Sequence, residues 1–139
     1  MLTHKKEYLM KKLLIVLLLI SLLIFTACTM KDELEVANMI GVYVSDKATL
    51  KINEFTDTSI GKEVDFQFDY TIPDKKTGTL FGNAEETDEN TFEFSYESLG
   101  VMYYTKLFYE DDYWIVEYIA DDPENKEHFD FSGTYHKRK

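Results

Sequence analysis

The chain has 139 residues, a formal net charge of −11, one cysteine and an aromatic content of 15%. With 45% hydrophobic residues and only 2 prolines and 6 glycines, it is not a collagen-like, linker-like or disordered chain. The length fits one folded domain.

The charge is unevenly distributed along the chain. Residues 1–27 hold four lysines and one glutamate, which leaves 11 basic and 25 acidic residues, a charge of −14, over residues 28–139. Such an acidic surface repels phosphate backbones, so nucleic acid is not an expected partner. It would attract a cationic protein, peptide or metal ion, although an acidic surface that serves only solubility is the plainer alternative.

The N-terminal segment has the parts of an export signal. Lys11 and Lys12 precede an apolar run from Leu13 to Phe25 that only Ser21 interrupts. The run is shorter than the roughly 20 residues that a membrane-spanning helix needs, and a charged start followed by a short apolar run is typical of a signal peptide. Because Met10 directly precedes the two lysines, we expect translation to begin there.

The apolar run closes on Phe25-Thr26-Ala27-Cys28, which resembles the lipobox of bacterial lipoproteins. The resemblance implies that residues 1–27 are a cleaved signal peptide and that Cys28 receives diacylglycerol. The mature protein would then be anchored to the cell membrane on its extracytoplasmic face. The alternative is an ordinary thiol near the end of an uncleaved anchor. Since Cys28 is the only cysteine, its lipidation would leave no thiol for a disulfide or a redox role.

The pattern after Cys28 changes from a tether and helix to strands. A short helix is predicted from about Asp32 to Met39, and Gly41 is its stop signal, so residues 28–40 form the tether and helix. Polar and apolar residues then alternate over 41–136, which predicts half-buried strands. The clearest buried faces are Val64, Phe66, Phe68, Tyr70 and Ile72; Phe92, Phe94 and Tyr96; and Phe129, Phe131 and Tyr135.

The connections between these strands decide the fold class. Weaker strands are predicted over 42–45, 48–53, 77–84, 101–109 and 113–119. Polar segments such as 56–62 and 85–90 are predicted loops. About eight short strands with short connections must be antiparallel, because parallel pairing needs a crossover of a dozen or more residues. We therefore expect a mostly β fold, an antiparallel meander forming a small barrel or sandwich, with residues 137–139 as a basic tail.

One hairpin can be predicted to the residue. A two-residue loop at Asp111-Asp112 sets Lys106 opposite Glu117 and Tyr109 opposite Trp114. The face that carries the two charges should point outward, and it also carries five large residues that we call the outer patch. The outer patch consists of Tyr104, Phe108, Tyr113, Ile115 and Ile119. An apolar surface of this size marks a contact, either with a binding partner or with the N-terminal helix or a second sheet of the same chain.

No motif for catalysis or for a cofactor is present. The sequence has no Gly-rich phosphate loop, nucleophile elbow or His-Glu-x-x-His pair. His128 and His136 on one strand would lie about 26 Å apart, so they cannot share a metal ion, and each is expected to be exposed. Acidic runs such as 121–125 lack the spacing of a calcium loop. We therefore expect no metal, no cofactor and no enzymatic activity.

A second resemblance covers the predicted strands. The order Gly41-x-Tyr43, Leu50-x-Ile52, Phe66-x-Phe68, Thr77-Gly78-x-x-x-Gly82-x-Ala84 and Phe131-x-Gly133-x-Tyr135 is similar to a small β-domain of uncharacterised bacterial envelope proteins. Some of those proteins resemble lysozyme inhibitors, which implies a binding role at the envelope.

Three functions remain open at this point. The preferred one is a lipid-anchored interaction module for a cationic envelope protein, such as a wall hydrolase. The second is a barrel that carries a small apolar ligand in a cavity. That cavity would be lined by Phe66, Phe68, Phe92, Phe94 and Trp114. The third is an enzyme for which no nucleophile or base can be named.

Overall fold

The computed structural model describes residues 2–73 and 76–139, except for the side chains of residues 2–4, 25, 28–32 and 34. The chain divides into two units, one ending at Ala37 and the other spanning Asn38–Lys139. The first unit is helical and the second is a β-barrel.

A single helix, α1, spans Leu2–Met39, so the helix predicted over 32–39 is only its last part. The segment is rich in leucine and lysine, which favour helix, and it contains no glycine or proline that would end the helix earlier. Gly41, with a φ of 146°, lies two residues after the last helical residue, Met39. Within the described part of the chain, no helix is long and apolar enough to cross a membrane.

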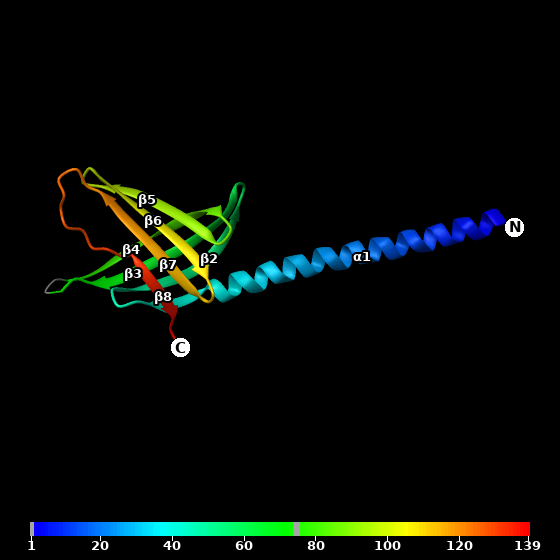
Figure 1. Cartoon of the computed structure of the whole chain (residues 1–139), viewed down its shortest axis with the longest axis horizontal. Helices are drawn as coiled ribbons and strands as arrows, with labels where there is room; N and C mark the ends of the chain where they lie inside the picture. The colour runs from blue at the N-terminus through cyan, green and yellow to red at the C-terminus, as the bar shows by residue number, and fades with distance from the viewer. Residues whose placement is uncertain (1, 74–75) are drawn as a thin grey trace. The chain divides into compact units, whose positions relative to one another are not determined.

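Eight antiparallel strands form the second unit, which confirms the predicted fold class. The strands are β1 (Gly41–Val44), β2 (Ala48–Thr58), β3 (Gly61–Thr71), β4 (Thr77–Asp88), β5 (Thr91–Ser98), β6 (Val101–Glu110), β7 (Tyr113–Asp121) and β8 (Gly133–Lys137). Each strand pairs with the next along the chain, and β8 pairs with β1, so the sheet closes into a barrel (Figure 1).

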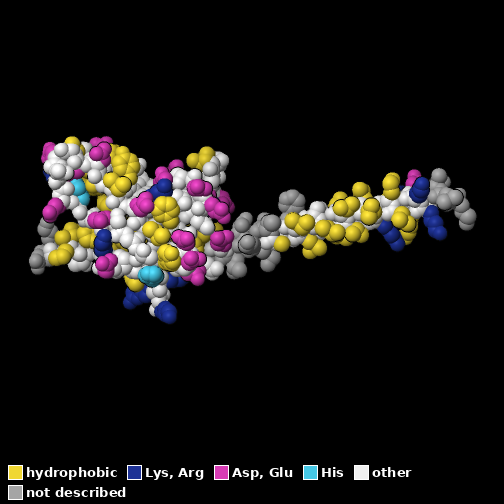
Figure 2. Space-filling view, viewed as in Figure 1, with side chains coloured by type: hydrophobic (Ala, Val, Ile, Leu, Met, Phe, Trp, Pro, Cys, Tyr) yellow, Lys and Arg dark blue, Asp and Glu magenta, His cyan; other side chains and the backbone are white. Residues whose placement is uncertain are grey.

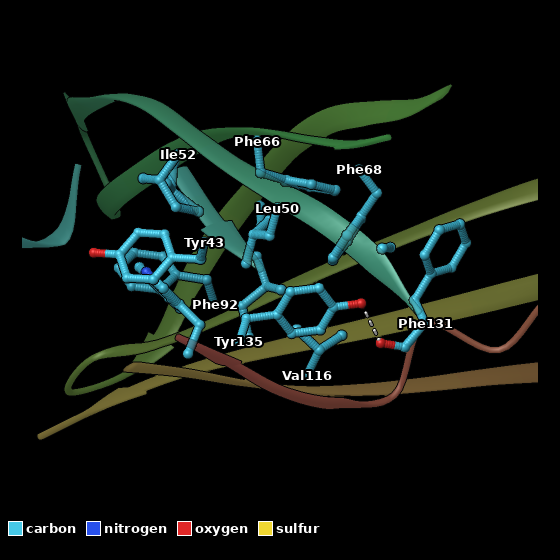
Figure 3. Close-up of a cluster of buried hydrophobic side chains, with 14 of the residues drawn as sticks. Tyr43, Leu50, Ile52, Phe66, Phe68, Phe92, Val116, Phe131 and Tyr135 are labelled. Carbon is cyan, nitrogen blue, oxygen red and sulfur yellow. Dashed lines mark hydrogen bonds between the residues drawn. The ribbon is translucent and has the colours of Figure 1, made fainter. Parts of the chain in front are cut away.

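Aromatic rings from opposite walls fill the barrel. Phe66 on β3 lies 5.2 Å from Phe94 on β5, measured between ring centroids, and Phe68 lies 4.8 Å from Phe131. The Tyr135 hydroxyl donates a hydrogen bond of 2.8 Å to the backbone oxygen of Phe131 (Figure 3). Trp114 is fully buried, with its ring 6.0 Å from that of Phe92 and 6.4 Å from that of Tyr43. The inner faces predicted for the strands at 64–70, 92–96 and 114–118 are therefore confirmed, whereas Ile72 lies beyond the end of β3 at Thr71.

Two predicted loops are wrong. The loops predicted over 56–62 and 85–90 shrink to turns at Ser59-Ile60 and Glu89-Asn90, because the flanking strands continue into them. Beyond Ile52, most residues of β2 are exposed. When both faces of a strand are exposed to solvent, its polar composition no longer distinguishes it from a loop.

The last predicted strand begins later than expected. Residues 129–132 have no strand structure, and β8 starts at Gly133. The Ser132 hydroxyl accepts a hydrogen bond from the backbone nitrogen of Tyr118 and donates one to its oxygen, so a side chain takes the place of backbone pairing. The barrel also extends past residue 136, because Lys137 pairs with Tyr43 and the Arg138 nitrogen donates to the Val42 oxygen. The basic tail predicted over 137–139 is thus partly in the sheet.

The hairpin between β6 and β7 has the predicted register. Lys106 pairs with Glu117 and Tyr109 with Trp114. Asp111 and Asp112 both have positive φ, 48° and 68°, which is the conformation of a type I′ turn. The β5–β6 turn is of the same kind, since Leu99 and Gly100 have φ values of 52° and 78°.

Leu99 is strained in that turn. A branched apolar residue rarely has a positive φ, and Leu99 is 100% exposed, so it gains nothing from packing. Leu99→Asn, which creates the preferred Asn-Gly turn, should stabilise the barrel by about 0.5–1 kcal/mol. Leu99→Val should destabilise it, and urea unfolding of the three proteins measures both effects. A stability order other than Asn above Leu above Val would contradict this reading of the turn.

Candidate functional site

The outer patch lies on the outward face of β6 and β7, as the hairpin register predicted. Tyr104 is 46% exposed and Ile119 is 62% exposed, and the two residues pair directly across the strands. Phe108, Tyr113 and Ile115 are half-buried. The patch therefore has an uncovered end at Tyr104 and Ile119.

Side chains from the barrel itself cover the other end. The Lys106 ammonium lies over the Phe108 ring, 5.1 Å from its centroid, and it also forms an ion pair of 3.3 Å with Glu93. The His136 ring lies 5.6 Å from the ring of Tyr113, its cross-strand partner. These contacts reduce the exposed apolar area at this end.

A groove of about 450 Å³ opens at the uncovered end of the patch. It is lined by Glu85, Thr87, Glu93, Phe94, Ser95, Tyr104, Thr105, Lys106, Glu117 and Ile119. Among these described lining residues, three are glutamates and one is a lysine, so the lining combines apolar side chains with a net negative charge. On the face of the barrel seen in Figure 2, hydrophobic and acidic side chains are likewise interspersed. A cationic group carrying apolar carbon atoms matches this lining.

A hydrogen-bonded chain of side chains lies elsewhere on the barrel, in the loop between β7 and β8. His128 Nε2 donates to the Asp122 carboxylate over 2.6 Å, and the Tyr103 hydroxyl lies 3.0 Å from His128 Nδ1. With Nε2 protonated toward the carboxylate, the neutral ring accepts the Tyr103 proton at Nδ1. The Asp122 carboxylate also accepts from the backbone nitrogens of Glu124 and Lys126. His128 is half-buried, so the predicted exposure of this histidine is wrong, whereas His136 is exposed.

Stacked tyrosines continue from this chain. Tyr103 stacks on Tyr96 at 4.8 Å, and the hydroxyls of Tyr96 and Tyr118 lie 3.1 Å apart. Burial raises the pKa of both Tyr96 and Tyr118, which keeps their hydroxyls protonated. A nucleophile or base would need the opposite shift, so Tyr96 and Tyr118 act as hydrogen-bond partners that link β5 to β7, while Tyr103 holds the β7–β8 loop through His128.

The remaining site predictions concern metals and the lipidated cysteine. In the described ranges, no group of three or more His, Cys, Asp or Glu side chains is placed to hold a metal ion. The backbone of Cys28 lies in α1, but its side chain lies outside the described residues.

The sequence could not have indicated the groove or the Asp122–His128–Tyr103 chain. The groove lining comes from four strands, and the sequence indicated only its part on β6 and β7, through the Lys106–Glu117 pair and the outward-facing Tyr104 and Ile119. The Asp122–His128 bond spans a loop with no repeating pattern. No known protein family, curated protein or solved structure matches the chain.

The bonds to Asp122 predict a pH dependence. The hydrogen bond from His128 and the two backbone donors lower the pKa of the Asp122 carboxyl. A lowered folded-state pKa gives stability that is complete above the unfolded value of about 3.9 and is lost as the pH falls through the folded value. Asp122→Asn should therefore lose less stability than the parent chain between about pH 5 and pH 2.

Urea unfolding over that pH range measures the difference. Glu97→Gln, which removes an exposed carboxylate from β5, is the matched control and should keep the parent slope. Equal slopes for Asp122→Asn and the parent would show that this carboxylate is not linked to folding.

Proposed function

We propose that this protein is a lipid-anchored, extracytoplasmic binding module that presents an acidic, aromatic groove to a cationic protein partner. The observation that supports it most is the groove at Tyr104 and Ile119, whose lining combines these exposed apolar side chains with three glutamates. Soluble proteins rarely leave such residues uncovered together unless they contact something.

Charge favours a cationic partner. Residues 28–139 carry a net charge of −14. The negative electrostatic field of such a domain speeds its encounter with a positively charged protein and disfavours anionic proteins. Lys106 is already paired with Glu93, so Glu85 and Glu117 are the carboxylates of the groove lining left to receive a cation. A wall hydrolase such as lysozyme has the required charge and location.

The barrel interior supports an external site over an internal one. Among the residues that would line the cavity of a carrier, Phe66 contacts Phe68 at 5.7 Å and Phe94 at 5.2 Å, measured between ring centroids. Phe92 and Trp114 are likewise in contact, with centroids 6.0 Å apart. Rings that fill one another's space leave the exposed groove as the better ligand site, and we therefore do not adopt the carrier hypothesis.

Binding to a cationic probe tests the proposal. Lysozyme should bind the full chain at about 0.05 M salt, and its affinity should fall at least roughly tenfold at about 0.5 M, because salt screens exposed charges. Tyr104→Ser and Ile119→Ser should each weaken binding at low salt. Titration calorimetry measures all of these affinities.

The control is Ile60→Ser, which removes an exposed apolar residue from the β2–β3 turn, outside the groove lining. It should bind like the parent. An affinity that does not change with salt would refute the electrostatic part of the proposal. Equal effects of the groove and control variants would refute the groove as the site.

Lipid anchoring needs a separate measurement. Mass spectrometry of the protein extracted from the membrane of an expressing bacterium should find an N-terminus at residue 28 carrying diacylglycerol. Cys28→Ser removes the acceptor sulfur and should leave the leader attached. Finding the parent chain with residue 28 unmodified and residues 10–27 still present would refute the anchor.

A further inference from the structure

The seam between β4 and β5 is paired only at one end. Its pairs are Glu85–Glu93, Glu86–Phe92 and Asp88–Thr91, all next to the hairpin turn. Figure 1 shows the two strands diverging from that turn. Beyond the pairs, residues 77–84 of β4 pair with β3 and residues 94–98 of β5 pair with β6, and neither segment has a described partner on its other side. We call these two facing edges the open seam.

Aromatic rings close the open seam on the inside. A Cβ atom on Gly82 would lie 2.6 Å from the Phe94 ring, and one on Gly78 would lie 2.3 Å from the Tyr70 ring. The rings therefore lie directly against the β4 backbone, where side chains would otherwise be. The Phe94 ring of β5 lies against Gly82 of β4 across the seam, so a ligand there would meet backbone edges and the outer face before the barrel interior.

The β4 edge lacks the features that protect most exposed strand edges. Natural edge strands carry charged residues, proline or a bulge that prevents pairing with another chain. Residues 77–84 contain no charged residue and no proline, and their register with β3 is continuous. Phe81, on the outer face of this edge, is 73% exposed. Such an edge is suited to accept an added strand.

The surrounding charges select the type of strand. Glu97 lies on the outer face of β5 across the open seam and Asp65 lies on β3 next to β4, and neither has a described ion pair, whereas Glu93 pairs with Lys106 and Asp69 pairs with Lys51. A second copy of the chain would bring another −14 domain to the same place, which like-charge repulsion opposes. A strand with alternating lysine or arginine would instead place its cationic side chains among these carboxylates.

We propose that residues 77–84 of β4 bind an extended, cationic segment of the partner protein as an additional antiparallel strand. The proposal rests on the function proposed above and specifies how the partner is held. Backbone hydrogen bonds to β4 supply sequence-independent affinity, and the acidic flanks select for positive charge. Phe81 offers an apolar contact for one of the side chains between the cations.

The test uses a short peptide in which lysine alternates with valine or threonine, and the purified full chain. An added edge strand pairs through only one of its own edges, so alternate backbone amides point toward β4. Two further peptides carry N-methyl groups on the odd or on the even amides and keep the same charge. One of them should lose affinity roughly tenfold or more, because several hydrogen bonds are removed, and the other should bind nearly as well as the parent peptide.

Hydrogen exchange locates the peptide on the protein. Amides within 77–84 should become protected when the parent peptide binds, while those of β7 should not change. Phe81→Ser should weaken binding severalfold, and Ile60→Ser, equally exposed but outside the open seam, should not. Both are surface residues, so folding does not confound the comparison.

The outcomes distinguish strand addition at β4 from the proposed function of binding a cationic partner. If both methylated peptides bind like the parent while salt still abolishes binding, strand addition is refuted and the cationic-partner function stands. Protection on β6 and β7 without protection of 77–84 would place the peptide on the part of the groove away from the open seam and would likewise refute it. Binding that is indifferent to salt would refute the proposed function itself.

Discussion

Ring-to-ring packing across the barrel is the interaction on which the rest of this structure depends. The only cysteine lies at position 28, before the barrel begins, so the barrel has no internal disulfide. Its stability must come from apolar burial, and aromatic side chains supply the largest burial per residue. Phe66, Phe68 and Trp114 are each fully buried. Because these rings fill the interior, chemistry and recognition are left to the outer surface and the strand edges.

The fold could be predicted where local signals agreed with the tertiary structure. In the β6–β7 hairpin, one charge pair, Lys106–Glu117, and one aromatic pair, Tyr109–Trp114, were enough to choose the register. The alternation of polar and apolar residues failed to predict the strands at the exposed hairpin ends, where no face is buried. It also wrongly predicted a strand at residues 129–132, because no pattern could indicate that the Ser132 hydroxyl would replace a backbone partner.

The candidate site could be predicted only in part. The alternation in β6 and β7 assigned Tyr104 and Ile119 to the outside, since a strand places every second residue on one face. It could not indicate that Lys106 would cover Phe108, nor that β4 and β5 would separate after three pairs. Both depend on how strands far apart in the chain curve toward one another. Two glycines, Gly78 and Gly82, were the only local signal of the separation, because glycine in a strand often marks a close approach.

The short turns have a consequence for the order in which the barrel assembles. Most strand pairs join neighbours along the chain, so their contacts are local and form early, at a small entropic cost of loop closure. The β1–β8 pair is different, because it joins Val44 to His136 and must wait for nearly the whole domain. We expect a folding intermediate in which the curled sheet is already built but not yet closed. In that species the β1 and β8 edges would be as open to a foreign strand as β4 is in the finished barrel, so rapid closure would also be what prevents aggregation.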